Sequence, residues 1–503
     1  MVRWITLFIT FLSIKSFAIV DMKNANFADS WQDLIATGSG YDLRVRRTYN
    51  SRSLFNGIFG FGWCSDFETS IAIMDSGEIK LTECGGGLEV IYSPKKAMDK
   101  EGRKLALTKP GTVFYANGKG VEGIEFKGDH YLRKMVDGTA QKFDKEGRLV
   151  LVSDKNGNYL KLSYNNRGPM EIIDNNGRKL GFSYYDNGKI KKVVGPNSSS
   201  VEYKFKGDDL SEVKNAWGNS YTYTYDDLHN LTAINFPDKT SKKITYNKDK
   251  DWVTSFTNRK GCIEKYDYKI DGDGKEHYRS EVVKTCKDQV TNKSFYEFWY
   301  KSRGDGSKYL SRVLTNNNGD ETDMTYHEVF GRPTAVTKNG EKVVYKYFDN
   351  GQVQEQIFKD RMSKFKYDSD LNKIAEVTTT YFNPDKKKEK SVVTNFSYDG
   401  KGNVVEAKNS FGQLVKIGYD PKGRIVSIKD QAKKWIKINY EERFGKPSRV
   451  ESHGVGTINV TYKGSGDIDK VDSKEGPIVA QQVASTFNNL MDILAPATTQ
   501  LRL

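Results

Sequence analysis

The sequence repeats an aromatic residue followed by a turn at intervals of about 21 residues, and this period restricts the fold more than any other feature. A first run of copies begins at Phe143, Tyr164, Tyr185, Phe205, Tyr225, Tyr246 and Tyr266. A second run begins at Tyr326, Tyr347, Tyr367, Tyr398, Tyr419, Tyr440 and Tyr462, with an insertion over residues 383–390. Such regular spacing indicates a repeat architecture in which each copy packs on its neighbours.

One copy shows how a repeat is built. Residues 398–403 (Tyr-Asp-Gly-Lys-Gly-Asn) predict a turn, because Asp bonds its own backbone and Gly adopts positive φ. Residues 404–408 and 413–419 alternate apolar and polar side chains, as half-buried strands do, and residues 409–412 form a second turn between them. Each repeat is therefore two short strands, and stacked repeats extend one sheet.

The predicted fold is all-β, an array of hairpin repeats forming a long curved or spiral sheet. Strand twist must curl a sheet of so many strands. A propeller would need two repeats per blade, but alternate repeats do not resemble each other more than adjacent ones do. The mean hydropathy of -0.67 would suggest disorder if aromatic residues were scarce, but they make up 12% of the chain, which favours many short strands.

The repeat copies resemble the YD repeat of the RHS-repeat family over about residues 130–470. The residues that carry this resemblance are Tyr164 and Gly168; Tyr185, Asp186 and Gly188; Tyr225 and Asp226; Tyr398, Asp399 and Gly402; and Tyr419, Asp420 and Gly423. Residues 38–63 are similar to the segment that opens RHS cores. The resemblance implies hairpins wound into a hollow cocoon, here an open or partial one, as in the repeat shells of toxin complexes and teneurins.

Toxin members of that family enclose a C-terminal toxic domain, which is freed by self-cleavage near an Asp-Pro-x-Gly segment. The matching segment here, residues 420–423, lies inside an ordinary repeat and more repeats follow it. We therefore expect neither self-cleavage nor toxin release.

Residues 1–18 resemble a cleavable signal peptide, with a basic start, an apolar run and small residues before a cleavage point after Ala18. The alternative, an uncleaved anchor, would need a longer apolar run. We expect a secreted, periplasmic or cell-surface protein with no transmembrane segment. The expected segments are 1–18 (signal peptide), 19–130 (RHS-opening β segment), 131–266 (YD repeats), 267–325 (diverged repeats or an insertion), 326–470 (YD repeats) and 471–503 (helix and tail).

Four cysteines in an exported chain favour disulfides. They form two pairs that are close in sequence, so we predict Cys64–Cys84 and Cys262–Cys286. A metal site built from all four is the alternative, but no zinc-ligand spacing occurs, and we expect no metal and no cofactor.

The aromatic run Phe295, Tyr296, Phe298, Trp299 and Tyr300 is a candidate ligand platform for sugars, although a buried strand is the preferred interpretation. Residues 271–274 (Asp-Gly-Asp-Gly) resemble the start of a calcium loop, but the later ligands are missing and a hairpin turn fits better. Over residues 477–494, apolar side chains recur at helical spacing, which predicts a helix that docks on the shell or plugs an open end.

The sequence contains no catalytic motif: no nucleophile elbow, phosphate loop or HExxH segment, and its five histidines lie far apart. Removing residues 1–18 deletes Arg3 and Lys15 and no acidic residue, which lowers the formal charge from +14 to +12. This charge is spread along the chain, so we expect a solubilising surface and no specific nucleic acid partner.

These observations favour a non-enzymatic scaffold that encloses or presents a protein client. A module that binds cell-surface glycans is the alternative, and a glycan-processing enzyme is a third hypothesis.

Overall fold

A computed structural model of the chain describes residues 19–84, 87–94, 109–270, 276–385, 387–464, 466–476 and 478–498. The signal segment and the calcium-like residues 271–274 lie outside this range.

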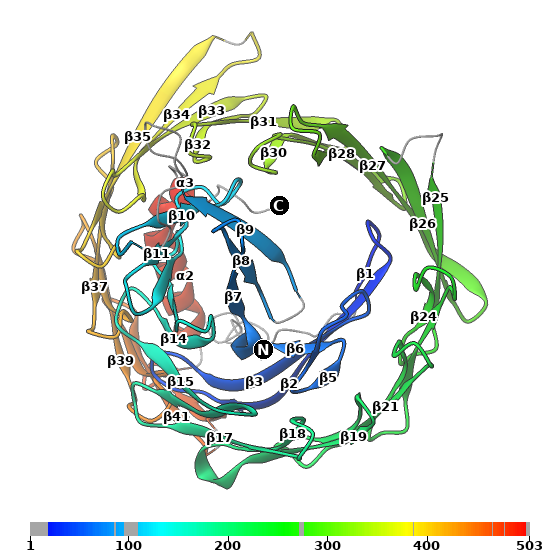
Figure 1. Ribbon diagram of the computed structural model, residues 1–503. Helices are drawn as coiled ribbons and strands as arrows, with labels where there is room; N and C mark the ends of the chain where they lie inside the picture. Colours follow the sequence, from blue (N-terminus) through cyan, green and yellow to red (C-terminus); the bar gives the residue numbers. More distant parts are fainter. Residues whose placement is uncertain are drawn as a thin grey trace.

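The described chain builds one long antiparallel sheet, the wall, in which 36 strands pair in chain order from β7 to β42 (Figure 1). Its first strands are β7 (Ser70–Ile73), β8 (Ile79–Thr82), β9 (Glu89–Pro94), β10 (Val113–Tyr115), β11 (Gly123–Phe126), β12 (Tyr131–Lys134), β13 (Ala140–Phe143), β14 (Leu149–Ser153), β15 (Tyr159–Asn165), β16 (Gly168–Asp174), β17 (Lys179–Tyr184) and β18 (Ile190–Val194). The middle strands are β19 (Ser200–Lys206), β20 (Asp209–Lys214), β21 (Ser220–Tyr225), β22 (Leu231–Asn235), β23 (Ser241–Tyr246), β24 (Val253–Thr257), β25 (Ile263–Ile270), β26 (His277–Cys286), β27 (Gln289–Ser302), β28 (Lys308–Asn317), β29 (Asp320–Tyr326) and β30 (Pro333–Lys338). The last are β31 (Glu341–Tyr347), β32 (Val353–Ile357), β33 (Arg361–Tyr367), β34 (Ile374–Phe382), β35 (Lys388–Tyr398), β36 (Val404–Asn409), β37 (Leu414–Tyr419), β38 (Ile425–Asp430), β39 (Trp435–Tyr440), β40 (Pro447–Ser452), β41 (Gly456–Tyr462) and β42 (Ile468–Asp472). The short 3-10 helix η2 (Pro196–Ser198) lies in one of the turns.

A β-bulge precedes the aromatic residue of the repeats, for example between Ser397 and Tyr398 and between Gly418 and Tyr419. A bulge bends its strand and increases the local right-handed twist. Because the bulge recurs at one end of successive hairpins, the bends add along the sheet. The wall therefore curls into the ring seen in Figure 1, which confirms the predicted curved sheet.

The sheet winds as a spiral. Among the described residues, the register pairs β42 with β41 alone, so the last strand does not close onto the first by a strand ladder. In Figure 1 the early strands β10–β17 and the late strands β37–β41 lie over the same sector of the ring. Hydrogen bonds between their turns show that the second revolution stacks on the first.

A second, smaller sheet lies inside the ring (Figure 1). Residues 19–69, here called the inner block, contain β1 (Ile19–Asp21), β2 (Asn26–Ala36), β3 (Leu43–Asn50), β4 (Asn56–Gly57), β5 (Gly60–Phe61), β6 (Trp63–Ser65) and η1 (Asp66–Glu68). Its apolar face packs on the inner face of the first revolution, and the largest core of the protein lies between these two layers. Trp63 and Phe27 are fully buried there.

The predicted C-terminal helix lies inside the ring and covers the inner face of the second revolution (Figure 1). It consists of α2 (Val479–Met491), followed by η3 (Asp492–Leu494) and α3 (Ala495–Thr498). Val479, Val483 and Leu490 are buried against β37–β41. The helix thus docks on the wall with the spacing that the sequence indicated.

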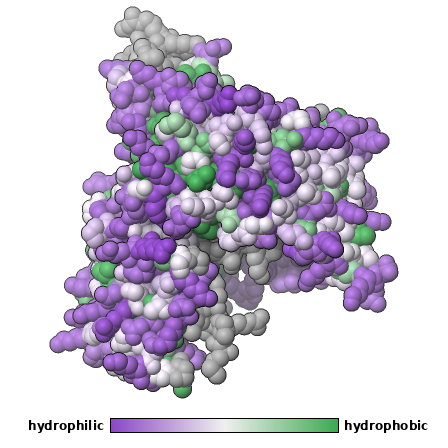
Figure 2. Space-filling view, turned by 90° about the horizontal axis from the view of Figure 1, so that it is seen from below, coloured by the Kyte–Doolittle hydropathy of each residue, from purple (hydrophilic) through white to green (hydrophobic). Residues whose placement is uncertain are grey.

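Residues 267–325 continue the wall as the long strands β25–β29, so the interruption of the sequence period is a set of lengthened hairpins. Figure 2 shows an outer surface that is mostly hydrophilic, with small scattered apolar patches. Within the described ranges, no helix is both long and apolar enough to span a bilayer.

Candidate functional site

Most of the repeat tyrosines tie their hairpin to the preceding one. Tyr419 Oη donates a hydrogen bond to the backbone oxygen of Val404, 15 residues earlier, at 3.0 Å. The same bond joins Tyr164 to Leu149, Tyr184 to Pro169, Tyr225 to Leu210, Tyr246 to Leu231, Tyr347 to Pro333, Tyr367 to Val353, Tyr398 to Ile374, Tyr440 to Ile425 and Tyr462 to Pro447. The hydroxyl satisfies a carbonyl at a strand start, so the Tyr of the repeat has a structural role. In the copy that the sequence spacing assigned to Tyr266, the bond comes from Tyr268 to Val253, and Tyr266 Oη donates to Glu264 instead.

The repeat aspartates close the turns. Asp399 Oδ1 accepts hydrogen bonds from the backbone N–H groups of Lys401 and Asn403, each at 2.9 Å. Gly402 follows with φ +78°, a conformation that favours glycine. Asp420 and Gly423 repeat this geometry in the next copy, and Asp226 does so in an earlier one.

In the copy around residue 185, the structure shifts the repeat tyrosine by one position from the one that the sequence spacing predicts. Tyr184, not Tyr185, donates the hydroxyl bond to the preceding hairpin. Tyr185 begins the turn, since its N–H donates to Lys189 O and its own carbonyl accepts from Gly188. Asp186 therefore does not close this turn and forms an exposed ion pair with Arg167 instead. The adjacent pair of tyrosines had hidden this shift.

The two revolutions meet at a seam, where second turns of the early hairpins contact Tyr-Asp turns of the late ones. Lys155 Nζ donates to the backbone oxygen of Gly402 at 2.7 Å. Beside it, Asn403 Nδ2 donates to Asn156 Oδ1 at 2.9 Å. These partners are 247 residues apart in sequence, and their contact fixes the rise of the spiral.

The seam continues along the next repeat. Asn158 Nδ2 donates to the backbone oxygen of Lys422, and Lys422 Nζ donates to Asn176 Oδ1, both at 3.0 Å. Lys422 and Gly423 belong to the segment that resembles the family's cleavage motif. In this chain that segment is a wall turn with a partner across the seam.

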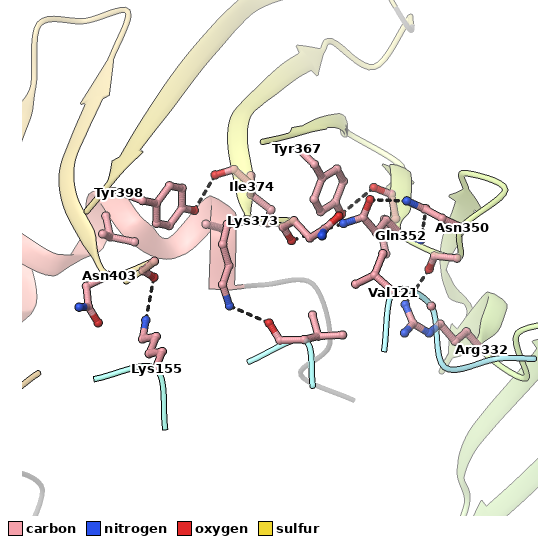
Figure 3. Close-up of a pocket in the computed structure, with 18 of the residues that line it drawn as sticks. Val121, Lys155, Arg332, Asn350, Gln352, Tyr367, Lys373, Ile374, Tyr398 and Asn403 are labelled. Atoms are coloured by element: carbon pink, nitrogen blue, oxygen red, sulfur yellow. Dashed lines mark hydrogen bonds between the residues drawn. The ribbon is translucent and has the colours of Figure 1, made fainter. Parts of the chain in front are cut away.

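A groove of about 450 Å³ opens along the seam (Figure 3). Lys155 lines it from the first revolution, and Lys373 and Arg332 line it from the second. Lys373 Nζ donates to the backbone oxygen of Val136 at 2.8 Å, while Arg332 Nη1 donates to Gly351 O at 2.7 Å. Figure 3 shows these three cations spaced along the groove rather than gathered at one point.

The groove cations are half-buried and lack carboxylate partners. None of Lys155, Lys373 and Arg332 forms an ion pair in the part of the chain that the structure describes. Burial lowers the pKa of Lys155, and the positive charge of Lys373 lowers it further. Burial also lowers the pKa of Lys373. The carboxylates of Asp137, Asp154 and Asp399 oppose the shift at Lys155, but none of them forms an ion pair with a groove cation in the described chain.

A buried ion pair anchors the inner block on the wall. Arg47 Nε donates to Asp33 Oδ2 at 2.7 Å, and both side chains are almost completely buried. Tyr203 Oη donates to Asp33 Oδ2 at 3.0 Å, while Arg47 Nη2 donates to Tyr223 Oη at 2.5 Å. The guanidinium lies 4.3 Å from the centroid of the Trp63 ring. No sequence pattern indicates this cluster, because Arg47 and Tyr223 are 176 residues apart.

The five aromatic residues of the candidate ligand platform divide between the two faces of β27. Tyr296, Phe298 and Tyr300 pack inward with Met22 of the inner block. Phe295 and Trp299 lie on the other face, because side chains alternate along a strand.

Trp299 on that outer face has no free ring surface for a sugar. His277 from β26 stacks on its ring at 4.7 Å, and the Arg312 guanidinium from β28 lies 4.5 Å from its centroid. Since β26 and β28 flank β27, both faces of the ring are covered. These residues therefore do not form a continuous stacking platform.

Both disulfides join the cysteines that are close in sequence. Cys64 pairs with Cys84 and Cys262 with Cys286, with Cα–Cα separations of 5.4 and 4.4 Å. The first ties the inner block to the start of the wall, and the second links β26 to the turn before β25. No group of three or more metal-ligating side chains occurs within the described segments.

Comparisons with known proteins give partial matches. A family profile described as a domain of unknown function, DUF6531, matches residues 18–90. The chain is 27% identical over 265 residues to the tRNA3(Ser)-specific nuclease WapA of Bacillus spizizenii and to the tRNA nuclease WapA of Bacillus subtilis strain 168. Each alignment covers 43% of this chain but only 11% of the relative.

Among solved structures, the chain resembles the TcdB2-TccC3-TEV crystal structure, with a TM-score of 0.46, 12% identity and coverage of 91% of this chain and 28% of the other. It also resembles a Photorhabdus luminescens Tc holotoxin pore, with a TM-score of 0.45, 12% identity and coverage of 91% and 26%.

The sequence repeats and the wound sheet define a shell of β-hairpins. Within that class, the Tyr-Asp repeats of the chain resemble the YD repeat of the RHS-repeat family.

Proposed function

We propose that the chain is an exported, non-enzymatic scaffold whose shell encloses or presents a protein client. The observation that carries this proposal is the seam: the wall winds past a full revolution and its turns lock onto one another. A wall held in this way separates an inside from an outside. Its interior is already organised by two docked layers, the inner block and α2.

Export is part of the proposal. The two disulfides fit an oxidising compartment, and residues 1–18 have the pattern of a signal peptide. Mass spectrometry of protein recovered outside the cytoplasm should find Ile19 as its first residue. Retention of residues 1–18 in that material would contradict cleavage.

A staple across the seam tests the enclosing role. Asn156 and Asn403 touch across it, so the N156C/N403C double variant should form a third disulfide. The protein is refolded with a short, fluorescent, unstructured polypeptide as the probe. We expect the probe to elute with the protein, to resist protease, and to escape more slowly from the oxidised variant than from the reduced one.

The N156C and N403C single variants control for the substitutions themselves. A probe that is digested equally fast with and without the protein would refute enclosure. The non-enzymatic part is tested by incubating the protein with tRNA and with polysaccharides, from which we expect no products. Turnover that disappears on a single Asp or Glu substitution would overturn it.

A further inference from the structure

We propose that the seam groove binds a short anionic saccharide, which bridges the two revolutions through Lys155, Lys373 and Arg332. This proposal depends on the contacts at the seam and not on the enclosing role.

Several lysines elsewhere on the wall face acidic residues across neighbouring strands. Lys192 pairs with Glu202 at 2.9 Å, and Lys204 pairs with Glu212 at 2.9 Å. The groove cations have no such partners in the described chain, although they are more buried. The two lysines are therefore partly desolvated without an ion-pair partner.

The hydrogen-bonding capacity of the two lysines is also unfilled. An ammonium group has three donors, and each of these groups uses one on a backbone carbonyl. The nearby carboxylates of Asp137, Asp154 and Asp399 each accept backbone N–H groups of their own turns rather than bonds from these lysines. The remaining donors can meet an oxyanion that enters the groove.

The shape and lining of the groove favour a saccharide over a single small ion. Its volume of about 450 Å³ greatly exceeds that of one phosphate or sulfate, and its cations are spread along it (Figure 3). Asn350 and Asn372 add amide groups, and the Asn372 side chain has no hydrogen-bond partner in the described chain. Ammonium groups would meet the acidic groups of the sugar, and amides would meet its hydroxyls.

Such a ligand would strengthen the shell. Lys155 belongs to the first revolution and Lys373 to the second, so an anion that contacts both adds a bridge across the seam. Binding to the wound form alone raises its stability by mass action. Seam opening and ligand release are then coupled.

Calorimetry tests the inference with four probes: a galacturonic acid trimer, a heparin-derived disaccharide, inorganic tripolyphosphate and neutral maltotriose. We expect at least one acidic saccharide to bind, more weakly as salt rises, and to raise the melting temperature. Tripolyphosphate measures the contribution of charge alone and should bind more weakly than that saccharide. Equal binding of maltotriose, stronger binding of tripolyphosphate, or no binding by either acidic saccharide would overturn the inference.

Matched variants locate the site. The K155Q/K373Q variant should lose at least tenfold in affinity for the saccharide that binds. K408Q/K429Q removes the same charge from exposed positions on β36 and β38 and should change affinity less than twofold. Equal losses in the two variants would show general attraction to a basic protein and refute the site.

A measurement on the wild-type protein covers the case in which K155Q/K373Q does not fold. Amine acylation followed by mass spectrometry should show that the bound saccharide protects Lys155 and Lys373 but not Lys408. Unchanged labelling of all three lysines under saturating ligand would contradict the proposal. Either result leaves the N156C/N403C test of enclosure unaffected.

Discussion

Removing the guanidinium of Arg47 should detach the inner block from the wall. In Arg47→Met, Asp33 keeps the hydrogen bond from Tyr203 but loses its buried cationic partner. Breaking one side of a buried ion pair costs about 3–5 kcal/mol. Because one donor remains on Asp33, we expect the lower end of that range, about 3 kcal/mol.

A double-mutant cycle separates the pair from its surroundings. Asp33→Leu leaves Arg47 buried without a carboxylate and should cost a similar amount. The R47M/D33L variant leaves no buried charge at this position, so we expect its cost to fall below the sum of the single variants by ~2 kcal/mol or more.

Urea unfolding measures these free energies, and amide hydrogen exchange shows which strands lose stability. Amides of β2 and β3 should exchange faster in Arg47→Met, whereas those of β31–β33, whose core cluster contains no inner-block residue, should keep wild-type rates. If each single variant lost less than ~1 kcal/mol of unfolding free energy and the two losses were additive, this ion pair would not anchor the block.

Three further predictions concern the wall and the helix. Tyr419→Phe should lower the free energy of unfolding by about 1 kcal/mol, because it removes the hydroxyl bond to the preceding hairpin. Tyr309→Phe should leave the free energy of unfolding unchanged in the same urea assay, because the Tyr309 hydroxyl has no partner in the described chain. Burial raises the pKa of Tyr419 to about 12, so the stability that this shift contributes is complete below the unfolded pKa near 10 and is lost as pH rises toward 12. The tyrosinate absorbance that distinguishes the wild-type protein from Tyr419→Phe should therefore appear together with unfolding, and its appearance well before unfolding would contradict this. Val483→Asp should release α2 and increase its proteolysis, while Gln482→Asp on the exposed face should not; equal digestion of the two variants would argue against docking.

The local parts of the structure follow from the sequence because the interactions that decide them are local. Asp399 and Gly402 specify a turn through bonds within six residues, and the alternation along β37 specifies its buried face. The same locality explains the misplacement at Tyr185: two adjacent tyrosines satisfy the spacing equally well, and only the hydroxyl bond of Tyr184 separates them.

The seam and the anchor could not be predicted, because they depend on how far each hairpin rotates relative to the last. That rotation is set by the bulges, whose geometry has no strong signature in the sequence. A small difference per repeat accumulates over a revolution, so the partner of Lys155 could have been any of several later turns. Gly402 takes that place only because the accumulated rotation brings it there.

The seam also limits how this chain can change by duplication. Repeat arrays commonly gain or lose units, because each unit contacts only its neighbours. Here a repeat added between residues 178 and 332 would shift every later turn by one position, and Lys155 would face a different copy. A repeat added beyond the overlapping turns would leave those pairings intact. The seam contacts therefore require a fixed number of repeats in one revolution. This part of the chain should tolerate amino-acid substitutions more readily than the gain or loss of a repeat.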